Sequence, residues 1–165
     1  LPIYITTNTE GKDMFFDDFT LGQEFKFDSA SICLRNMLAF AHEYDPMPVH
    51  TDKQWGEESR FGDIIAPGIM SFMAVWANFV RKNIISEQFI AGKSFRVNWF
   101  IPVYDEDVLT GKAIITRLVE RNPYNGIVEI RIVIHNQKDE LVMDTYTEAI
   151  IARHSAAERL AGSVN

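Results

Sequence analysis

The chain has 165 residues, of which 47% are hydrophobic and 24% are charged, and its formal net charge is −7. This composition is typical of one folded domain and excludes a disordered regulator, while the acidic balance argues against nucleic acid as a partner and weakly against an anionic membrane. The single cysteine, Cys33, excludes an internal disulfide framework and a multi-cysteine metal site. The first residues do not have the pattern of a secretory leader, so we expect a cytoplasmic domain.

The first part of the chain predicts a lead-in, a strand and a helix. Residues 1–18 are polar and mixed, and Phe19 to Phe27 has the pattern of an interrupted strand. A serine-capped helix is expected to follow and to run through Ala41. It must end before Asp45, because a residue that precedes proline is disfavoured in the helical conformation. Cys33 lies in this predicted helix and is expected to be a buried small hydrophobe.

The middle of the chain predicts one short and one long helix. Thr51 and Gln54 have the spacing of a capping box, which predicts a short helix over Asp52 to Ser59. A loop follows, and Pro67 then opens a long helix that we expect over roughly Ile69 to Asn83. Because this segment has almost no polar face, it is predicted to be the central core helix.

The second half of the chain changes to the alternating pattern of strands. Four segments have this pattern: Phe95 to Trp99, Asp107 to Glu120, Ile127 to His135, and Leu141 to Ala152. The turns between the last three are expected at Asn125-Gly126 and at residues 137–140. Short turns imply antiparallel pairing of the strands, and the apolar helix must be buried against another element. We therefore predict an α+β domain in which a curled antiparallel sheet wraps around a long central helix.

The segment from Asp45 to His50 is the first candidate for chemistry. Two prolines stiffen the chain between a carboxylate and an imidazole, and both groups lie on one short connection between helices. Such a pair could hold one water molecule for general acid–base catalysis. A plain turn between helices would explain the same residue types.

The start of the long helix is the second candidate. A glycine at a helix N-terminus, here Gly68, allows close approach of a ligand to N–H groups that carry partial positive charge. These groups could stabilise a carbonyl oxygen as negative charge develops on it. The alternative is that Pro67 simply starts the helix and Gly68 packs tightly. The remaining histidines, His42, His135 and His154, lack ligand partners at metal-binding spacing, so no metal is expected.

Taken together, three segments resemble the motifs of the MaoC-like dehydratase family, which includes the (R)-specific enoyl-CoA hydratases of the hot-dog fold. The segments are Asp45-Pro46-Met47-Pro48-Val49-His50-Thr51-Asp52, Ala66-Pro67-Gly68-Ile69-Met70, and Phe95 to Val103 continuing to Leu109. The resemblance implies a lead-in over residues 1–18, a single hot-dog domain over 19–152 and a C-terminal tail over 153–165, in which a short helix is expected.

The resemblance also implies an activity. Water would add to, or leave, the 2,3-double bond of an enoyl thioester, with acyl-CoA favoured over an acyl carrier protein thioester. Asp45 and His50 would be the catalytic pair, and the backbone at Gly68 and Ile69 would bind the thioester oxygen. No cofactor is expected besides coenzyme A as part of the substrate, and a homodimer or an assembly of dimers is expected.

Four residues depart from the family pattern: Tyr44, Met47, Pro67 and Trp76. The last three are expected to shape the substrate pocket. Two alternatives remain open, a hot-dog acyl-CoA thioesterase and a non-catalytic subunit that binds acyl thioesters. A phosphate-bearing substrate would need local positive charge in this acidic chain. The candidate cations near the motifs are Arg60, Arg81, Lys93 and Arg96.

Overall fold

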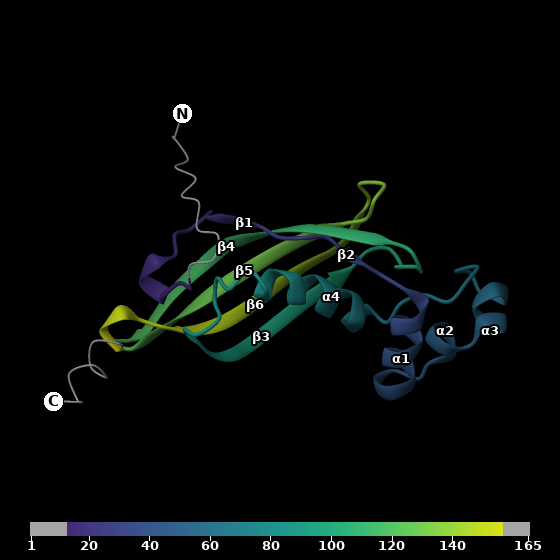
Figure 1. Cartoon of the computed structure of the whole chain (residues 1–165), viewed down its shortest axis with the longest axis horizontal. Coiled ribbons are helices and arrows are strands. Elements are labelled where there is room, and N and C mark those ends of the chain that lie inside the picture. Colours follow the sequence, from purple (N-terminus) through teal and green to yellow (C-terminus); the bar gives the residue numbers. More distant parts are fainter. Residues whose placement is uncertain (1–12, 157–165) are drawn as a thin grey trace.

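The computed structural model describes residues 13–156. Figure 1 shows a long twisted sheet with a helix lying along it and further helices gathered at one end. In chain order the elements are η1 (Phe16–Asp18), β1 (Glu24–Lys26), β2 (Ala30–Ser31), α1 (Leu34–Tyr44), α2 (Pro48–Thr51), α3 (Lys53–Glu58), α4 (Gly68–Val80), β3 (Phe89–Trp99), β4 (Val108–Asn122), β5 (Asn125–His135) and β6 (Leu141–Ala152). None of these helices is long and apolar enough to cross a membrane.

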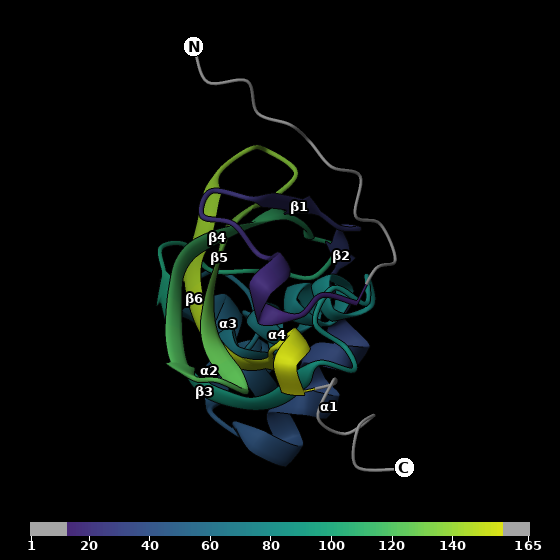
Figure 2. The same cartoon turned by 90° about the vertical axis from the view of Figure 1, so that its left-hand side faces the viewer.

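The sheet is antiparallel throughout the described part of the chain. Its strand order is β1-β4-β5-β6-β3, and β2 pairs with β4 beside this path. Viewed end-on, the strands curl around α4 (Figure 2). The predicted α+β class and the curled sheet around a central helix are therefore confirmed. β3 lies at one edge of the order, so one of its sides has no strand partner among the described residues.

Helix α4 fills the concave side of the sheet with one face only. Phe72, Val75 and Phe79 are buried in the core, where the Phe79 ring lies among other aromatic rings. Ile69 and Met73 remain exposed on another face, so the prediction of a helix buried nearly all round is only partly correct. The helix also ends earlier than Asn83, because the chain turns there with hydrogen bonds from residues 82 and 83 back to residues 79 and 80, and residue 83 has a positive φ of 55°.

The segment before the first strand is more closely packed than its polar composition suggests. Met14 and Phe16 are buried in the core, and the Met14 N–H donates to the Ile84 carbonyl. Of the predicted strand Phe19 to Phe27, only the three residues of β1 are extended and paired, because a turn with Gly22 at φ +79° precedes them. Residues 1–12 and 157–165 lie outside the described part, so the predicted C-terminal helix falls largely outside it.

Two predicted helix starts are wrong in detail. Cys33 is not inside the first helix but precedes α1 in an extended conformation, and it is exposed rather than buried. Thr51 does not cap the short acidic helix, because it ends a separate one-turn helix and its hydroxyl donates to the Met47 carbonyl. The cap of α3 is Asp52, whose carboxylate accepts from the Trp55 N–H at 3.0 Å.

One predicted turn is displaced by two residues. Asn125 and Gly126 belong to β5, and the chain reverses at Pro123-Tyr124 instead. A Cβ on Gly126 would overlap the ring of Phe16, so this glycine is needed for close packing in the strand. β3 begins at Phe89 rather than at Phe95, and β4 runs from Val108 to Asn122 rather than from Asp107 to Glu120. β6 has the predicted bounds.

Candidate active site

Asp45 and His50 face each other across the short connection between α1 and α2. Asp45 directly follows the last residue of α1, and His50 lies within the one-turn helix that Pro48 begins. Their closest atoms are Asp45 Oδ2 and His50 Nε2, 3.5 Å apart. His50 is buried, with 8% of its surface exposed, whereas the Asp45 side chain is 35% exposed. The imidazole is therefore shielded from solvent, whereas the carboxylate is partly accessible to it.

The second nitrogen of His50 sets which tautomer the ring adopts. His50 Nδ1 lies 2.7 Å from the carbonyl oxygen of Ile65. A carbonyl oxygen can only accept, so Nδ1 carries the hydrogen and neutral His50 presents an unprotonated Nε2 towards Asp45. The loop that supplies this carbonyl is itself held in place, because the N–H of Ile65 donates to Val49 O and the N–H of Ala66 donates to Val103 O. Nε2 is thus the imidazole atom available for proton exchange.

The indole ring of Trp99 covers the first residue of α4. Trp99 Nε1 donates to the Gly68 carbonyl at 3.1 Å, and a Cβ on Gly68 would lie 2.7 Å from Trp99 Cε2. Only glycine leaves room for the ring in its present place. The first turn of a helix leaves its N–H groups without intrahelical acceptors, here those of Gly68 and Ile69. These donors suit an oxygen that gains negative charge.

These groups meet at a cavity of about 560 Å³. This volume lies within the range of small-molecule sites, about 300–1,000 Å³. Its lining residues are Asp45, His50, Arg60, Phe61, Ile65, Ala66, Gly68, Ile69, Ser71, Trp99, Phe100, Ile101, Pro102 and Val103. One carboxylate, one imidazole, a helix N-terminus and an apolar wall therefore share one space. Among residues 13–156, no group of three or more His, Cys, Asp or Glu side chains is placed to hold a metal ion.

The structure brings four of the seven predicted site residues to this cavity, namely Asp45, His50, Gly68 and Ile69. The three residues expected to shape the pocket are not among its lining. Met47 is 56% exposed and caps α2, and Pro67 is buried directly before α4. Trp76 packs against the core with its ring 5.3 Å from that of Phe79, so the tryptophan that bounds this cavity is Trp99 instead.

Several lining residues were not among the seven site residues predicted from the sequence. Trp99, Phe100 and Ile101 come from the end of β3 and the residues after it, and Arg60 and Phe61 come from the loop before α4. Trp99, Phe100 and Ile101 lie in the third sequence motif, Phe95 to Val103, but the motif alone did not assign them to the pocket. Arg60 was predicted only as one of four candidate cations for a phosphate-bearing substrate, not as a residue of the site.

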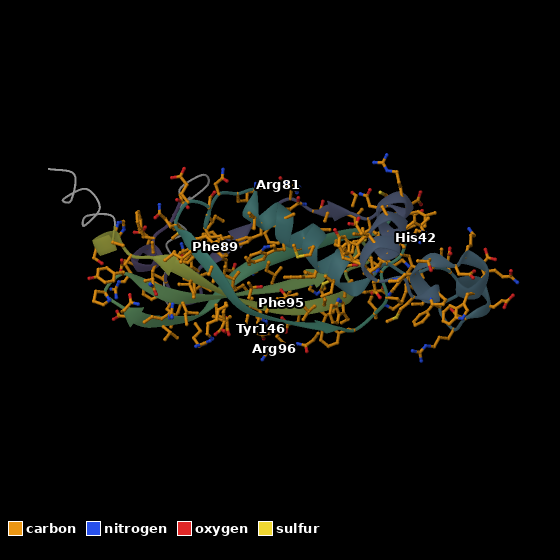
Figure 3. All side chains as sticks on the ribbon, turned by 90° about the horizontal axis from the view of Figure 1, so that it is seen from below. His42, Arg81, Phe89, Phe95, Arg96 and Tyr146 are labelled. Carbon is orange, nitrogen blue, oxygen red and sulfur yellow. The ribbon has the colours of Figure 1, made fainter. Side chains whose placement is uncertain are left out.

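The four candidate cations lie in different places. Lys93 binds Glu148 on the sheet, and hydrogen bonds from Lys93, then Ser94, lower the pKa of Glu148 to about 2. The guanidinium of Arg96 lies 4.3 Å from the centre of the Tyr146 ring. Figure 3 shows Arg96 and Tyr146 together on the side of the sheet away from α4, with Arg81 on the opposite side. Of the four, only Arg60 lines the cavity.

Comparison with known proteins gives one family. Residues 18–134 match the family described as MaoC like domain. The chain is 30% identical over 142 residues to the uncharacterized protein YdeM of Bacillus subtilis strain 168, covering 85% of this chain and 100% of that protein.

Two solved structures illustrate the shared fold. The MaoC-like dehydratase of Rhodospirillum rubrum has a TM-score of 0.77 and 24% identity, covering 86% of this chain and 98% of that one. The (R)-hydratase PhaJ1 of Pseudomonas aeruginosa has a TM-score of 0.68 and 24% identity, covering 86% of each chain. The resemblance inferred from the sequence motifs is thereby confirmed: this chain belongs to the MaoC-like dehydratase family.

Proposed function

We propose that the protein is a hydratase or dehydratase that adds water to, or removes it from, the 2,3-double bond of an enoyl thioester, with coenzyme A as the favoured carrier. The observation that carries the proposal is the pairing of Asp45 Oδ2 with His50 Nε2 in the same cavity as the N-terminus of α4. Membership of the family and the fold shared with an (R)-hydratase support it.

The geometry suits the steps of hydration. A separation of 3.5 Å between the carboxylate and Nε2 is longer than a direct hydrogen bond, and a water molecule beside both groups could bond to each. One group would take a proton from this water as its oxygen bonds to the β-carbon, and the pair would return a proton to the α-carbon. The thioester oxygen gains negative charge in this step, and the N–H groups of Gly68 and Ile69 would stabilise it.

The decisive test compares the wild type with Asp45→Asn and His50→Ala on a set of enoyl-CoA substrates. We expect loss of the enoyl-thioester absorbance without release of thiol, and a fall in kcat of about 10²–10⁴ in each variant. His42→Ala and Asp28→Asn are matched controls, because both residues are exposed and neither lines the cavity. Free thiol as the product would favour a thioesterase, and acyl-CoA binding without turnover would favour a non-catalytic subunit.

We further propose that the protein acts as a homodimer that pairs along β3. This edge strand and the residue after it expose large apolar side chains that a monomer has no reason to leave in water. These are Phe89, Ile90, Phe95, Trp99 and Phe100. Phe89 and Phe95 are marked on this strand in Figure 3. Ile69 of α4, which lines the cavity together with Trp99 and Phe100, is exposed as well.

The association state tests the dimer. Sedimentation should give twice the mass of the chain at micromolar concentration, and Phe95→Lys should shift the protein towards a monomer, because a charge would be buried in the interface. Leu21→Lys is the matched control, since Leu21 is 65% exposed and lies in the turn before β1. A monomeric wild type, or equal dissociation of both variants, would contradict pairing along β3.

A further inference from the structure

Arg60 is a positive charge in the wall of the cavity that no acidic side chain of residues 13–156 neutralises. It lies between α3 and α4 and lines the cavity together with Asp45 and His50. It forms no ion pair with any carboxylate of residues 13–156. Its guanidinium lies 5.0 Å from the centre of the Phe61 ring, a cation–π arrangement that leaves the N–H groups at its edge free to bond elsewhere.

The backbone that carries Arg60 is held from both sides. The Ser59 hydroxyl accepts from the Phe61 N–H at 3.1 Å and donates to the Gly56 carbonyl at 2.7 Å. The hydroxyl of Tyr104 donates to the Phe61 carbonyl at 3.0 Å. Burial, with smaller effects of two nearby carboxylates, raises the pKa of Tyr104, so this phenol remains a donor at neutral pH. Arg60 is therefore presented to the cavity by a fixed loop.

The composition of the cavity wall indicates which kind of ligand group Arg60 could bind. The chain as a whole carries −7, and Arg60 is the only lysine or arginine of the described residues that lines the cavity. Apart from Asp45, His50 and Ser71, the other lining side chains are apolar, so an uncharged hydrocarbon chain would leave the guanidinium without a partner. A planar guanidinium binds carboxylate and phosphate through two parallel hydrogen bonds.

Resting on the proposed enoyl-thioester activity, we propose that Arg60 binds an oxyanion of the substrate while Asp45 and His50 act on its double bond. Two parts of a substrate could supply this oxyanion: a phosphate of the coenzyme A carrier, or a carboxylate on the acyl group. Arg60 is exposed to solvent at the cavity, so it stays hydrated until the anion arrives. Its role is selection among substrates rather than proton transfer.

The experiment measures three thioesters with wild type, Arg60→Gln and Arg60→Lys. Crotonyl-CoA carries phosphates, crotonyl-pantetheine carries none, and the fumaryl monothioester of pantetheine carries an acyl carboxylate. Values of kcat/KM are compared as ratios to crotonyl-pantetheine within each variant, and dissociation constants for the same compounds are measured by calorimetry. Arg81→Gln is the control, because Arg81 bonds to Asn78 near the end of α4 and does not line the cavity.

If the carrier phosphate is the partner, Arg60→Gln lowers the crotonyl-CoA ratio by about 10- to 100-fold, mainly through KM. If the acyl carboxylate is the partner, the fumaryl ratio falls by the same factor. Arg60→Lys should recover part of either loss, since lysine keeps the positive charge but lacks the planar guanidinium that forms two parallel hydrogen bonds. Ratios and relative affinities that equal those of the wild type would overturn the proposal. Absence of turnover by the wild type would count against the enoyl-thioester activity, and the calorimetric ratios would still decide the role of Arg60.

Discussion

Replacing Gly68 by alanine would place a methyl group where the Trp99 indole now lies. The new Cβ would be 2.7 Å from Cε2 and 2.8 Å from Nε1, closer than real Cβ contacts, so the ring must move. The move breaks the hydrogen bond to the Gly68 carbonyl, worth about 0.5–1.5 kcal/mol, while alanine recovers up to about 1 kcal/mol of helix propensity. Because Trp99 is 46% exposed within one chain, the ring can move without displacing side chains of that chain's core. We therefore expect the free energy of unfolding to change by no more than about 1 kcal/mol.

Activity should respond more strongly than stability. A displaced indole no longer holds the first turn of α4, and misplacement by about 1 Å near reacting atoms costs on the order of 10²-fold in rate. We expect kcat/KM for an enoyl thioester to fall about 10- to 100-fold in Gly68→Ala. Urea denaturation and steady-state kinetics on Gly68→Ala, Trp99→Ala and the double variant separate the effects. Gly92→Ala is the control, since its nearest neighbour atom would be 3.9 Å away, in the ring of Phe89.

In the Trp99→Ala background the new methyl group meets no ring, so Gly68→Ala should add little further loss. An equal loss of activity in both backgrounds would refute the reasoning, because the damage would then come from the Gly68 backbone itself and not from the contact with the indole.

Three further predictions concern stability. Asp52→Ala should lower the free energy of unfolding in urea by about 1 kcal/mol, because it removes the cap of α3, and Thr51→Ala should cost less; equal losses would contradict this assignment. Phe79→Ala should cost about 3–5 kcal/mol, since Phe79 is fully buried, and a loss near zero would contradict its place in the core. Glu148→Gln should cost about 1–2 kcal/mol at pH 7 after allowance for solvent screening. Since folding lowers the pKa of Glu148 from 4.5 to about 2, this stabilisation is present above pH 4.5 and is lost as the pH falls towards 2, so denaturation curves of wild type and variant should converge there.

Much of the fold could be predicted because its signals are local. The strand-like run Leu141–Ala152 was predicted as one strand, and the observed strand has the same bounds. The start of α4 was evident from Pro67 followed by glycine. The prediction of a turn at Asn125-Gly126 was wrong for a non-local reason. Phe16, which is distant in the sequence, occupies the space beside Gly126, and that glycine pairs within a strand.

The candidate site, like the fold, could be predicted where its signals are local and not where they depend on tertiary contacts. The proximity of Asp45 and His50 follows from two prolines in a six-residue stretch, which the sequence displays directly. The carbonyl of Ile65 that sets the His50 tautomer, and the indole that covers the start of α4, come from other elements and need the tertiary pairing to be seen. Trp76 was assigned to the pocket by counting along α4, but the helix turns that position towards the core ring of Phe79.

The most direct test of the proposed chemistry is the fate of crotonyl-CoA in heavy water. If Asp45 and His50 add water across the double bond, the wild-type product is a 3-hydroxybutyryl thioester with one deuterium on its α-carbon, and coenzyme A stays attached. His50→Ala should form this product at a rate lower by about 10²–10⁴. Free coenzyme A with an intact double bond, or an equal rate in wild type and His50→Ala, would contradict the account.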